Sequence, residues 1–491
     1  MPGVIINTAV RTGPSTPTAR EASQAFFAGI CPRGPVTGAS LVNSLEEFSA
    51  IYGPYTSTSM MHPTVEAFFE EGGTQCYIAR SAQSSAVSAT ITVLDATAGT
   101  PLVAFTLTAN GPGTWGNNLM CVVAAGTKTA SVTAKIYYEN GLLFNTFNCD
   151  TNEQIVGKIN SDPVASKYII ATIGVSSAAI AAPATRTLAT GANGTASTQT
   201  QIAAALDLFS DSLGTGAVSC PDGDAASVTV NTALVAHANA KNRIAILHGA
   251  SDASVSTIKT FARAITADIA SSEHAALYYP WVYAPTSVAG VTRLIPPDGY
   301  VCGKRSAAVN ATGPHQPYAG LQSSARFISG VVTDVDKDAG DLLDAESVNA
   351  IRVISNTVRI YGARSLSPDS SNFRYINAQD IVNGIVTDGY KALESVVFST
   401  IDGRNNSFAS VEAKLIAVLE QSRLAGALYE AFDANGRRVD FGYTVKCDSS
   451  LNPVSQLATG LVKARVGVRV SSVGDKIEVN IIKSNLTTSV I

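Results

Sequence analysis

The fold is decided by the stretch NRIAILHGA, residues 242 to 250, which is typical of a short buried strand. From about residue 199 to residue 300, the chain on either side of it alternates between helical and strand-like patterns. The helical segments are TQIAAALDLFSDSL, VNTALVAHANA and SVSTIKTFARAITADIA, and the strand-like ones are AVSCP, NRIAILHGA and HAALYYPWVYAP. Strands alternating with helices of about ten or more residues predict a largely parallel sheet with helices on both faces.

The preceding part of the chain, residues 23 to 80, has a similar α/β pattern. QAFFAGI and CYIAR read as strands, and HPTVEAFFEEGG reads as a helix. In LVNSLEEFSAIYG, one helical face carries apolar side chains and Gly53 is expected to end the helix.

The remaining segments complete a prediction of an α/β and α+β multidomain protein. Residues 84 to 200 are rich in Ala, Thr, Ser, Gly and Val in short alternating runs, which predicts an inserted β-rich domain. The segment from residue 298 to 320 reads as a turn-rich bridge, and residues 410 to 432 contain an amphipathic helix. The expected divisions are an N-terminal arm (1–22), the first part of the core (23–83), the β-rich insertion (84–200), a central α/β domain (201–345), a C-terminal α+β domain (346–470) and a C-terminal strand arm (471–491).

Both ends of the chain are expected to be strands that need a sheet. Near the C-terminus, DKIEVNIIK alternates apolar Ile477, Val479 and Ile481 with polar residues, and near the N-terminus MPGVIINT carries Val4, Ile5 and Ile6. Turning back at SSVGD would let DKIEVNIIK pair with ARVGVRV, residues 464 to 470, but an isolated hairpin is only marginally stable.

The sequence shows no recognisable catalytic, cofactor or metal site. GPGTWGNN, residues 111 to 118, has the glycine spacing of a phosphate loop, but Asn117 and Asn118 stand where that loop requires Lys and Ser or Thr. The five histidines are not paired at helical spacing, and the aspartates of VTDVDKDAGDLLDAE do not match an EF-hand. Seven scattered cysteines without a CxxC pair are expected to be reduced core residues.

Composition narrows the range of partners. Only 15% of the 491 residues are charged and the net charge is −4, so we expect no nucleic-acid partner. A weakly charged surface fits either burial against other subunits or a monomer with a polar, Ser- and Thr-rich surface. No signal peptide and no long apolar stretch occur, so membrane insertion is not expected.

Several segments, taken in order, resemble the contractile-tail sheath proteins of bacteriophages and related injection devices. They are MPGVIINT, FFAGICPRGPVTGASLVNSLEEFSAIYG, VEAFFEEGGTQCYIAR, GPGTWGNN, AALYYPWVYAP with IPPDGYVCG, AESVNAIRVI with VRIYGARSLSPDSSNFRYINAQDIV, and FGYTVKCDSSLNPVSQLATGLV. These blocks cover most of the chain outside residues 84 to 200. Ser365, where the family commonly has threonine, and AQDIV, where it commonly has an Arg-rich stretch, depart from the pattern, as does the segment AAVNATGPHQPYAG.

The resemblance implies a structural subunit and no enzyme. It implies self-assembly as six-membered rings in a helical sheath, with the tail tube, baseplate and tail terminator proteins as partners. The location implied is a virion tail, assembled in the host cytoplasm, whose contraction drives the tube through the envelope for genome ejection and host entry. A sheath of a phage-derived bacteriocin or injection machine is the alternative, and an α/β enzyme with a site not visible in the sequence is a remote one.

The resemblance also assigns roles to the two termini. It implies that Val4, Ile5 and Ile6 and then Ile477, Val479 and Ile481 belong to strands that add to a small sheet of neighbouring subunits. Gly13, Pro14, Pro17 and Gly474 then belong to tethers that let the domains rotate while the strands stay bound. The inserted segment, residues 84 to 200, is expected to face outward or, alternatively, to pack into the core.

Overall fold

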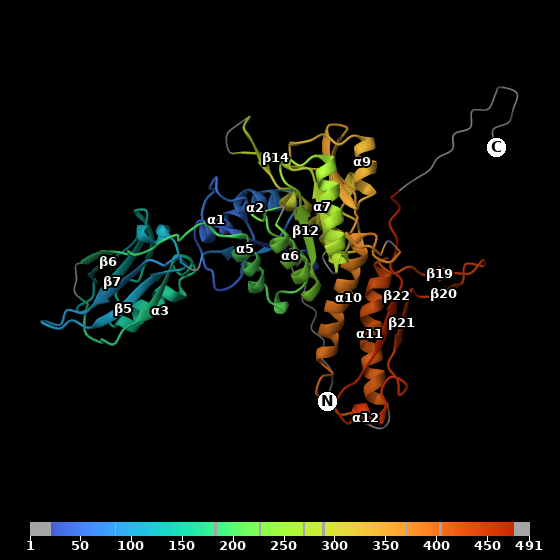
Figure 1. Cartoon of the computed structure of the whole chain (residues 1–491). Helices are drawn as coiled ribbons and strands as arrows, with labels where there is room; N and C mark the ends of the chain where they lie inside the picture. The colour runs from blue at the N-terminus through green and yellow to red at the C-terminus, as the bar shows by residue number, and fades with distance from the viewer. Residues whose placement is uncertain are drawn as a thin grey trace, which may run out of the picture.

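The computed structural model describes residues 21–83, 85–180, 184–224, 227–268, 271–286, 290–369, 371–401 and 405–475. The chain is a mixed α/β protein with several sheets (Figure 1). Short 3₁₀ helices join the elements at η1 (Glu21–Ser23), η2 (Thr114–Asn118), η3 (Leu206–Leu208), η4 (Asp211–Leu213), η5 (Ser272–His274) and η6 (Gly320–Ser323).

The largest sheet has eight strands in the order β18-β17-β13-β12-β11-β1-β3-β2. Its strands are β1 (Ala25–Ile30), β2 (Ser40–Val42), β3 (Cys76–Ser81), β11 (Ala217–Ser219), β12 (Ile244–His248), β13 (Ala275–Tyr279), β17 (Val348–Ile354) and β18 (Thr357–Tyr361). The six strands from β3 to β17 are parallel, and β2 and β18 are antiparallel at the two edges. Strands β17 and β18 extend this sheet, although the sequence placed a domain division before them at residue 345.

Helices cover both faces of this sheet, as the alternating pattern predicts. One apolar cluster packs α1 (Leu45–Tyr52), α2 (Met61–Glu70) and α8 (Asp298–Ala311) on one face. A second cluster packs α5 (Gln199–Ala205), α6 (Val228–Ala240), α7 (Val255–Asp268) and α9 (Lys337–Asp344) on the other. The Ser44 side chain caps α1, and Gly53, at φ 96°, ends it where the sequence placed the end.

Two expectations for the segment from residue 274 to 320 were wrong. HAALYYPWVYAP is two strands, β13 and β14 (Val282–Pro285), because Pro280 cannot donate a backbone hydrogen bond to continue one ladder. Strand β14 instead joins β15 (Thr292–Ile295) and β16 (Gly330–Val331) in a small sheet. The segment read as a turn-rich bridge contains the buried helix α8, whose Gly299 and Gly303 let its backbone approach α2. A Cβ on Gly299 would lie 2.1 Å from the Thr64 carbonyl oxygen, which explains why small residues occur inside this helix.

The chain between residues 85 and 198 forms a β-rich region with a hydrophobic core of its own. One sheet contains β4 (Thr90–Leu94), β5 (Val103–Ala109) and β9 (Ile169–Ile173), and the other contains β6 (Leu119–Ala125), β7 (Val132–Tyr138), β8 (Gly141–Asn145) and β10 (Ala184–Thr187). Helices α3 (Asn152–Ser161) and α4 (Ala165–Tyr168) pack against them. GPGTWGNN lies here as a bend and a 3₁₀ turn, where the Asn117 side chain bonds the backbone of Gly191.

Arg33 joins this inserted region to the rest of the molecule. Its guanidinium bonds the carbonyls of Ser49 and Ala50 at 2.9 Å each and the Tyr168 hydroxyl at 3.0 Å. It also lies 4.5 Å from the centre of the Tyr168 ring and 5.1 Å from that of Tyr138. A cation stacked on two aromatic rings gives the joint a defined geometry.

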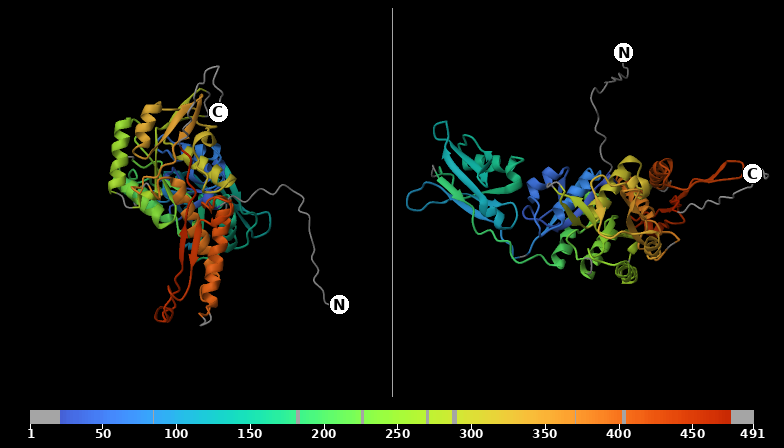
Figure 2. Two further views of the ribbon diagram at one scale, coloured as in Figure 1. Left: turned by 90° about the vertical axis from the view of Figure 1, so that its right-hand side faces the viewer. Right: turned by 90° about the horizontal axis from the view of Figure 1, so that it is seen from above.

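The last part of the described chain is a C-terminal unit, residues 376 to 470. It contains α10 (Ile376–Glu394), α11 (Asn406–Leu424), α12 (Val454–Leu457), the hairpin β19 (Ala431–Phe432) and β20 (Arg438–Asp440), and the two-stranded sheet β21 (Tyr443–Lys446) and β22 (Arg465–Val468). Seen from above, the inserted region and the C-terminal unit lie at opposite ends of an elongated molecule, with the large sheet between them (Figure 2).

Candidate functional site

All six residues expected to exchange strands, and three of the four expected tether residues, lie outside the described residues. This holds for Val4, Ile5, Ile6, Gly13, Pro14 and Pro17 at one end and for Ile477, Val479 and Ile481 at the other. Gly474 is described and exposed, and a Cβ built on it would have no heavy atom within 4 Å. The structure therefore informs the candidate site through the sheet that could receive such strands and through the described ends of the arms.

The candidate receiving surface is the two-stranded sheet β21–β22. Its strands are antiparallel, with Val445 opposite Val466. One face packs Tyr443, Val445, Val468 and Val470 on a small core of Ile381, Leu419, Ala427 and Leu428 from the α10–α11 side. Among the described strands, none pairs with the outer edge of β21 or of β22. Open edges that lie over an apolar core are suited to accept a further strand.

The segment ARVGVRV, residues 464 to 470, contains β22, and in the structure this strand pairs with β21. Beyond β22, Val470 bridges to Leu428, and the Ser471 amide donates to the Ala427 carbonyl at 2.9 Å. Residues 471 to 475, predicted as a possible turn, form neither a helix nor a strand and lead to Arg364. Residue 475 is therefore bound to a part of the molecule away from β22.

The root of the C-terminal arm, residues 471 to 475, is held by a buried arginine. The Asp475 carboxylate accepts a hydrogen bond from Arg364 Nη2 at 2.8 Å. The same guanidinium bonds Asp344 of α9 at 2.6 and 2.9 Å and lies 5.0 Å from the centre of the Tyr375 ring. Although burial opposes it, hydrogen bonding from Tyr375 and the charge of Arg364 lower the pKa of Asp475.

A groove of about 810 Å³ lies beside this root. Its walls come from α9, from the ends of β17 and β18, from residues 316 to 320 and from residues 473 to 475. Acidic and basic side chains both line it, including Asp341, Asp344, Arg352 and Arg364. The mixed charge does not select one class of small-molecule ligand.

The root of the N-terminal arm, residues 21 to 24, is also fixed by an arginine. The Ala22 carbonyl accepts a hydrogen bond from Arg305 Nη1 at 2.8 Å. Arg305 forms a two-bond ion pair with Asp380 of α10, at 2.9 and 2.6 Å, and both side chains are buried. The Gln24 side chain is buried as well and donates to the carbonyl of Thr215 at 3.3 Å and to that of Leu213.

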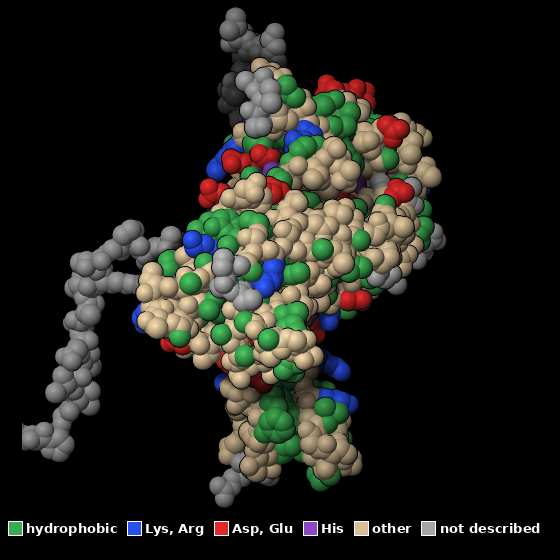
Figure 3. All heavy atoms as spheres, turned by 90° about the vertical axis from the view of Figure 1, so that its left-hand side faces the viewer, with side chains coloured by type: hydrophobic (Ala, Val, Ile, Leu, Met, Phe, Trp, Pro, Cys, Tyr) green, Lys and Arg blue, Asp and Glu red, His purple; other side chains and the backbone are tan. Residues whose placement is uncertain are grey.

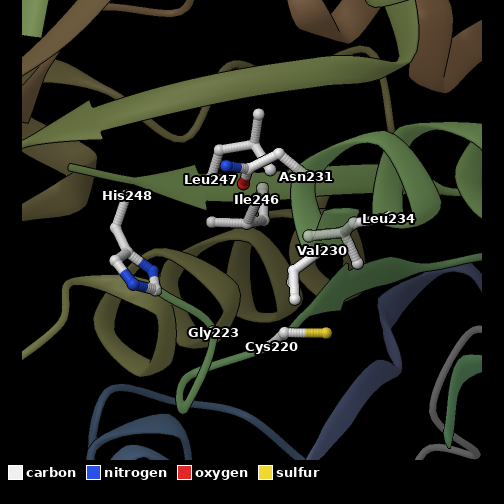
Figure 4. Close-up of a pocket in the computed structure, with 8 residues that line it drawn as sticks. All are labelled: Cys220, Gly223, Val230, Asn231, Leu234, Ile246, Leu247 and His248. Carbon is white, nitrogen blue, oxygen red and sulfur yellow. The ribbon is translucent and has the colours of Figure 1, made fainter. Parts of the chain in front are cut away.

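A buried polar cluster lies at the carboxyl ends of β11 and β12, where open α/β sheets often bind ligands. His248 Nδ1 lies 3.0 and 3.1 Å from the two carboxylate oxygens of Asp298, and the Ser219 hydroxyl donates to Oδ2 of the same carboxylate. Although burial opposes it, Asp298 raises the pKa of His248. The adjoining cavity of about 10 Å³, lined by His248, Cys220 and side chains of α6 and β12, has space for about one water molecule (Figure 4).

This cluster does not have the arrangement of a catalytic triad. Ser219 faces the carboxylate and not the imidazole, so no hydroxyl is paired with a base. Asp222 is likewise used structurally, since it accepts hydrogen bonds from the amides of Met60 at 2.6 Å and Ile30 at 2.7 Å. Each carboxylate here therefore satisfies buried donors of the fold.

Metal ligands, reactive thiols and membrane-spanning helices are the remaining possibilities among the described residues. No cluster of three or more His, Cys, Asp or Glu side chains suited to a metal is found among them. All seven cysteines are free and buried, and burial raises the pKa of Cys121 to about 12, so these thiols are core residues as the sequence predicts. In the part of the chain that the structure describes, no helix combines the length and apolarity needed to cross a membrane.

Solved structures of contractile-tail sheath proteins are similar to this chain over most of its length. A crystal structure of a sheath tail protein from Listeria innocua has a TM-score of 0.59 and 14% identity, covering 87% of this chain and 88% of that one. The sheath complex of an extracellular contractile injection system in its contracted state has a TM-score of 0.56 and 14% identity, with 99% and 98% covered. The chain has the fold of a contractile-tail sheath protein.

The helical sheath of the anti-feeding prophage in its contracted state gives a similar result. Its TM-score is 0.56 at 14% identity, with 98% of this chain and 99% of that chain covered. No family model matches the sequence, and no curated protein is similar to it in sequence. The resemblance seen in the ordered motifs is therefore confirmed at the level of the fold.

Proposed function

We propose that this chain is a sheath subunit of a contractile tail, which polymerises with copies of itself around an inner tube and contracts to drive that tube through an envelope. The observation that carries the proposal is the similarity of fold across 98 to 99% of both chains to sheaths of contractile injection systems. At this coverage, the likeness includes the inserted region as well as the central sheet.

In this proposal the subunits form stacked six-membered rings and are joined by strand exchange. The N-terminal arm, with Val4, Ile5 and Ile6, and the C-terminal arm, with Ile477, Val479 and Ile481, add to β21–β22 sheets of neighbouring copies. Two facts support this: the described strands leave both outer edges of that sheet free, and residue 475 is held at Arg364 instead of turning back on β22. Gly13, Pro14, Pro17 and Gly474 then act as tethers.

The proposal places the C-terminal unit toward the tube and the inserted region, residues 84 to 200, outward. The opposite positions of these regions in the elongated subunit support this orientation (Figure 2). The baseplate and the tail terminator are the expected partners at the ends of the sheath. A phage tail is our first assignment, and a bacteriocin or other injection machine is the alternative, which the presence or absence of neighbouring capsid and packaging genes distinguishes.

Electron microscopy of the purified protein tests the proposal. The full chain should form long tubes, and a variant without residues 1–15 should stay a folded monomer, because each subunit loses a strand that binds its neighbour. Long tubes from this truncation would contradict the strand-exchange proposal. In assembled tubes, limited proteolysis should cut the inserted region first.

Two matched triple variants test whether the predicted strand of the C-terminal arm has one buried face and one exposed face. Threonine at Ile477, Val479 and Ile481 keeps the β-propensity but removes the apolar face, and should prevent tube formation. Replacing Lys476, Glu478 and Asn480 with threonine changes only the predicted solvent-facing side of the strand and should leave tube formation intact. Equal behaviour of the two triple variants would show that this strand has no buried face.

A further inference from the structure

The two arm roots converge on one short stretch at the start of α10. The N-terminal root is tied through Arg305 to Asp380, which lies near the beginning of this helix. The C-terminal root is tied through Arg364 to Tyr375, the residue that immediately precedes it. Ile381 and Ile385 of α10 belong to the core below β21–β22. At 1.5 Å per residue, residues 375 to 385 span about 15 Å, so both roots and the candidate receiving sheet share one rigid helix.

The two ties differ in burial. At the N-terminal root, Arg305 is only 1% exposed and donates to the Ala22 carbonyl, and the next two residues of the chain, Ser23 and Gln24, are 1% and 2% exposed. Asp475, by contrast, is 33% exposed at its side chain, while Arg364 is 3% exposed. Released Asp475 would be solvated by water, and Arg364 would keep its two bonds to Asp344. The N-terminal root is therefore held by buried residues of the fold, whereas the C-terminal tie can be released into water.

Gly474 stands next to the releasable tie. Among the described residues, no heavy atom would lie within 4 Å of a Cβ at this position, so the side-chain side of Gly474 is open. Glycine also has the widest range of backbone angles. Its neighbour Asp475 is held by Arg364 and Tyr375.

We propose that the contact of Asp475 with Arg364 and Tyr375 is a latch that fixes the direction in which the C-terminal arm leaves the subunit and, when it opens, frees the Gly474 hinge. The inference rests on the proposed function, because the arm has a mechanical role only in a polymer. In that polymer, the root of the N-terminal arm stays attached to α10, and opening of the latch lets the C-terminal arm change direction at its root.

Hydrogen exchange on the full-length monomer tests the latch without requiring assembly. Asp475→Asn removes the charge but keeps the size of the side chain, and should increase amide exchange in peptides covering residues 471–475 by about fivefold. Tyr375→Phe removes the hydroxyl but keeps the ring beside Arg364, and should give a smaller increase. Asp211→Asn breaks an ion pair with Lys241 elsewhere on the surface and should leave residues 471–475 unchanged.

The polymer provides the second readout. Tubes of Asp475→Asn should form but should vary more in helical twist than wild-type tubes in electron micrographs, because the arm direction is no longer fixed. Exchange in Asp475→Asn equal to that of the wild type, or wild-type order of its tubes, overturns the latch. Failure of the wild-type protein to form any tubes contradicts the proposed function instead, and exchange in the monomer separates the two outcomes.

Discussion

The central sheet region and the C-terminal unit differ in how completely they bury their own apolar surface. The central sheet has a large apolar cluster on each face, and its buried ion pairs are completed within the subunit. Among its described residues, the C-terminal unit has a small core cluster of four buried residues and exposes many large apolar side chains. These include Tyr390, Phe398, Leu424, Tyr429, Phe432, Val439, Phe441, Val454 and Leu461.

This difference shows which part of the subunit is complete as a monomer. Apolar side chains also gather at the lower end of the molecule, where Figure 1 places α10 and α11 (Figure 3). Extensive exposed apolar surface on one unit is typical of a surface that is covered in an assembly. The central region is therefore the stable body, and the C-terminal unit is the part that the proposed polymer would complete.

The largest expected effect is the loss of a core side chain in the central region. Phe68 is fully buried, and its ring packs edge-on against that of Phe27 with 5.6 Å between the ring centres. Phe68→Ala should therefore lower the free energy of unfolding by about 3–5 kcal/mol. Leu419→Ala, in the small core of the C-terminal unit, should cost only about 2 kcal/mol, because a core close to the surface relaxes more easily.

Urea unfolding followed by two probes separates these variants. Both tryptophans, Trp115 and Trp281, lie outside the C-terminal unit, so their fluorescence does not report on it directly. Phe68→Ala should shift the fluorescence transition, whereas Leu419→Ala should shift far-ultraviolet circular dichroism more than fluorescence. Equal shifts of both probes in both variants would show that the two regions unfold as one unit.

The sequence predicted the central layer because its segments are locally consistent. Ile244–His248, Val255–Asp268 and Leu45–Tyr52 carry the periodicity of the element that they form, and tertiary contacts reinforce it. The errors arose where a residue has two possible roles. Gly299 and Gly303 read as turn residues, but their lack of a side chain serves the contact between α8 and α2, which only the packed structure reveals.

The candidate site was predictable in part. Alternation in ARVGVRV correctly indicated a strand, but its partner, Tyr443–Lys446, is separated from it by a segment with no hairpin signal. The ties of Arg305 and Arg364 could not be predicted, because their partners Ala22 and Asp475 lie far away in the sequence. Only the fold brings these pairs together, so no spacing rule would identify them.

A smaller effect is expected from acid, and it should act on the central region. Burial, reinforced by the charge of Arg243, lowers the pKa of His237 to about 4, while the unfolded chain should titrate near 6.5. As the pH falls from 6.5 to 4, the unfolded state takes up a proton that the folded state does not, so stability decreases. This single group should account for a loss of about 2–3 kcal/mol.

His237→Gln isolates this contribution. The variant cannot titrate at this position, so its stability should fall less than that of the wild type between pH 7 and pH 4, as measured by urea unfolding at each pH. Tryptophan fluorescence should report the difference, because Trp281 lies in the central part of the chain. Parallel pH profiles for the two proteins would show that His237 is protonated equally in the folded and unfolded states.

The smallest effect on the monomer is expected at the β19–β20 hairpin, beside the open sheet. Phe432 is 57% exposed there, so Phe432→Ser should change the free energy of unfolding by less than about 0.5 kcal/mol. If a neighbouring subunit covers this hairpin, the same change removes apolar burial from every contact and should raise the critical concentration for polymerisation by about tenfold. Phe432→Leu keeps an apolar side chain and should polymerise nearly as well as the wild type. An unchanged critical concentration for Phe432→Ser would mean that the hairpin stays exposed in the polymer. The small core of the C-terminal unit would then be covered by the arms alone.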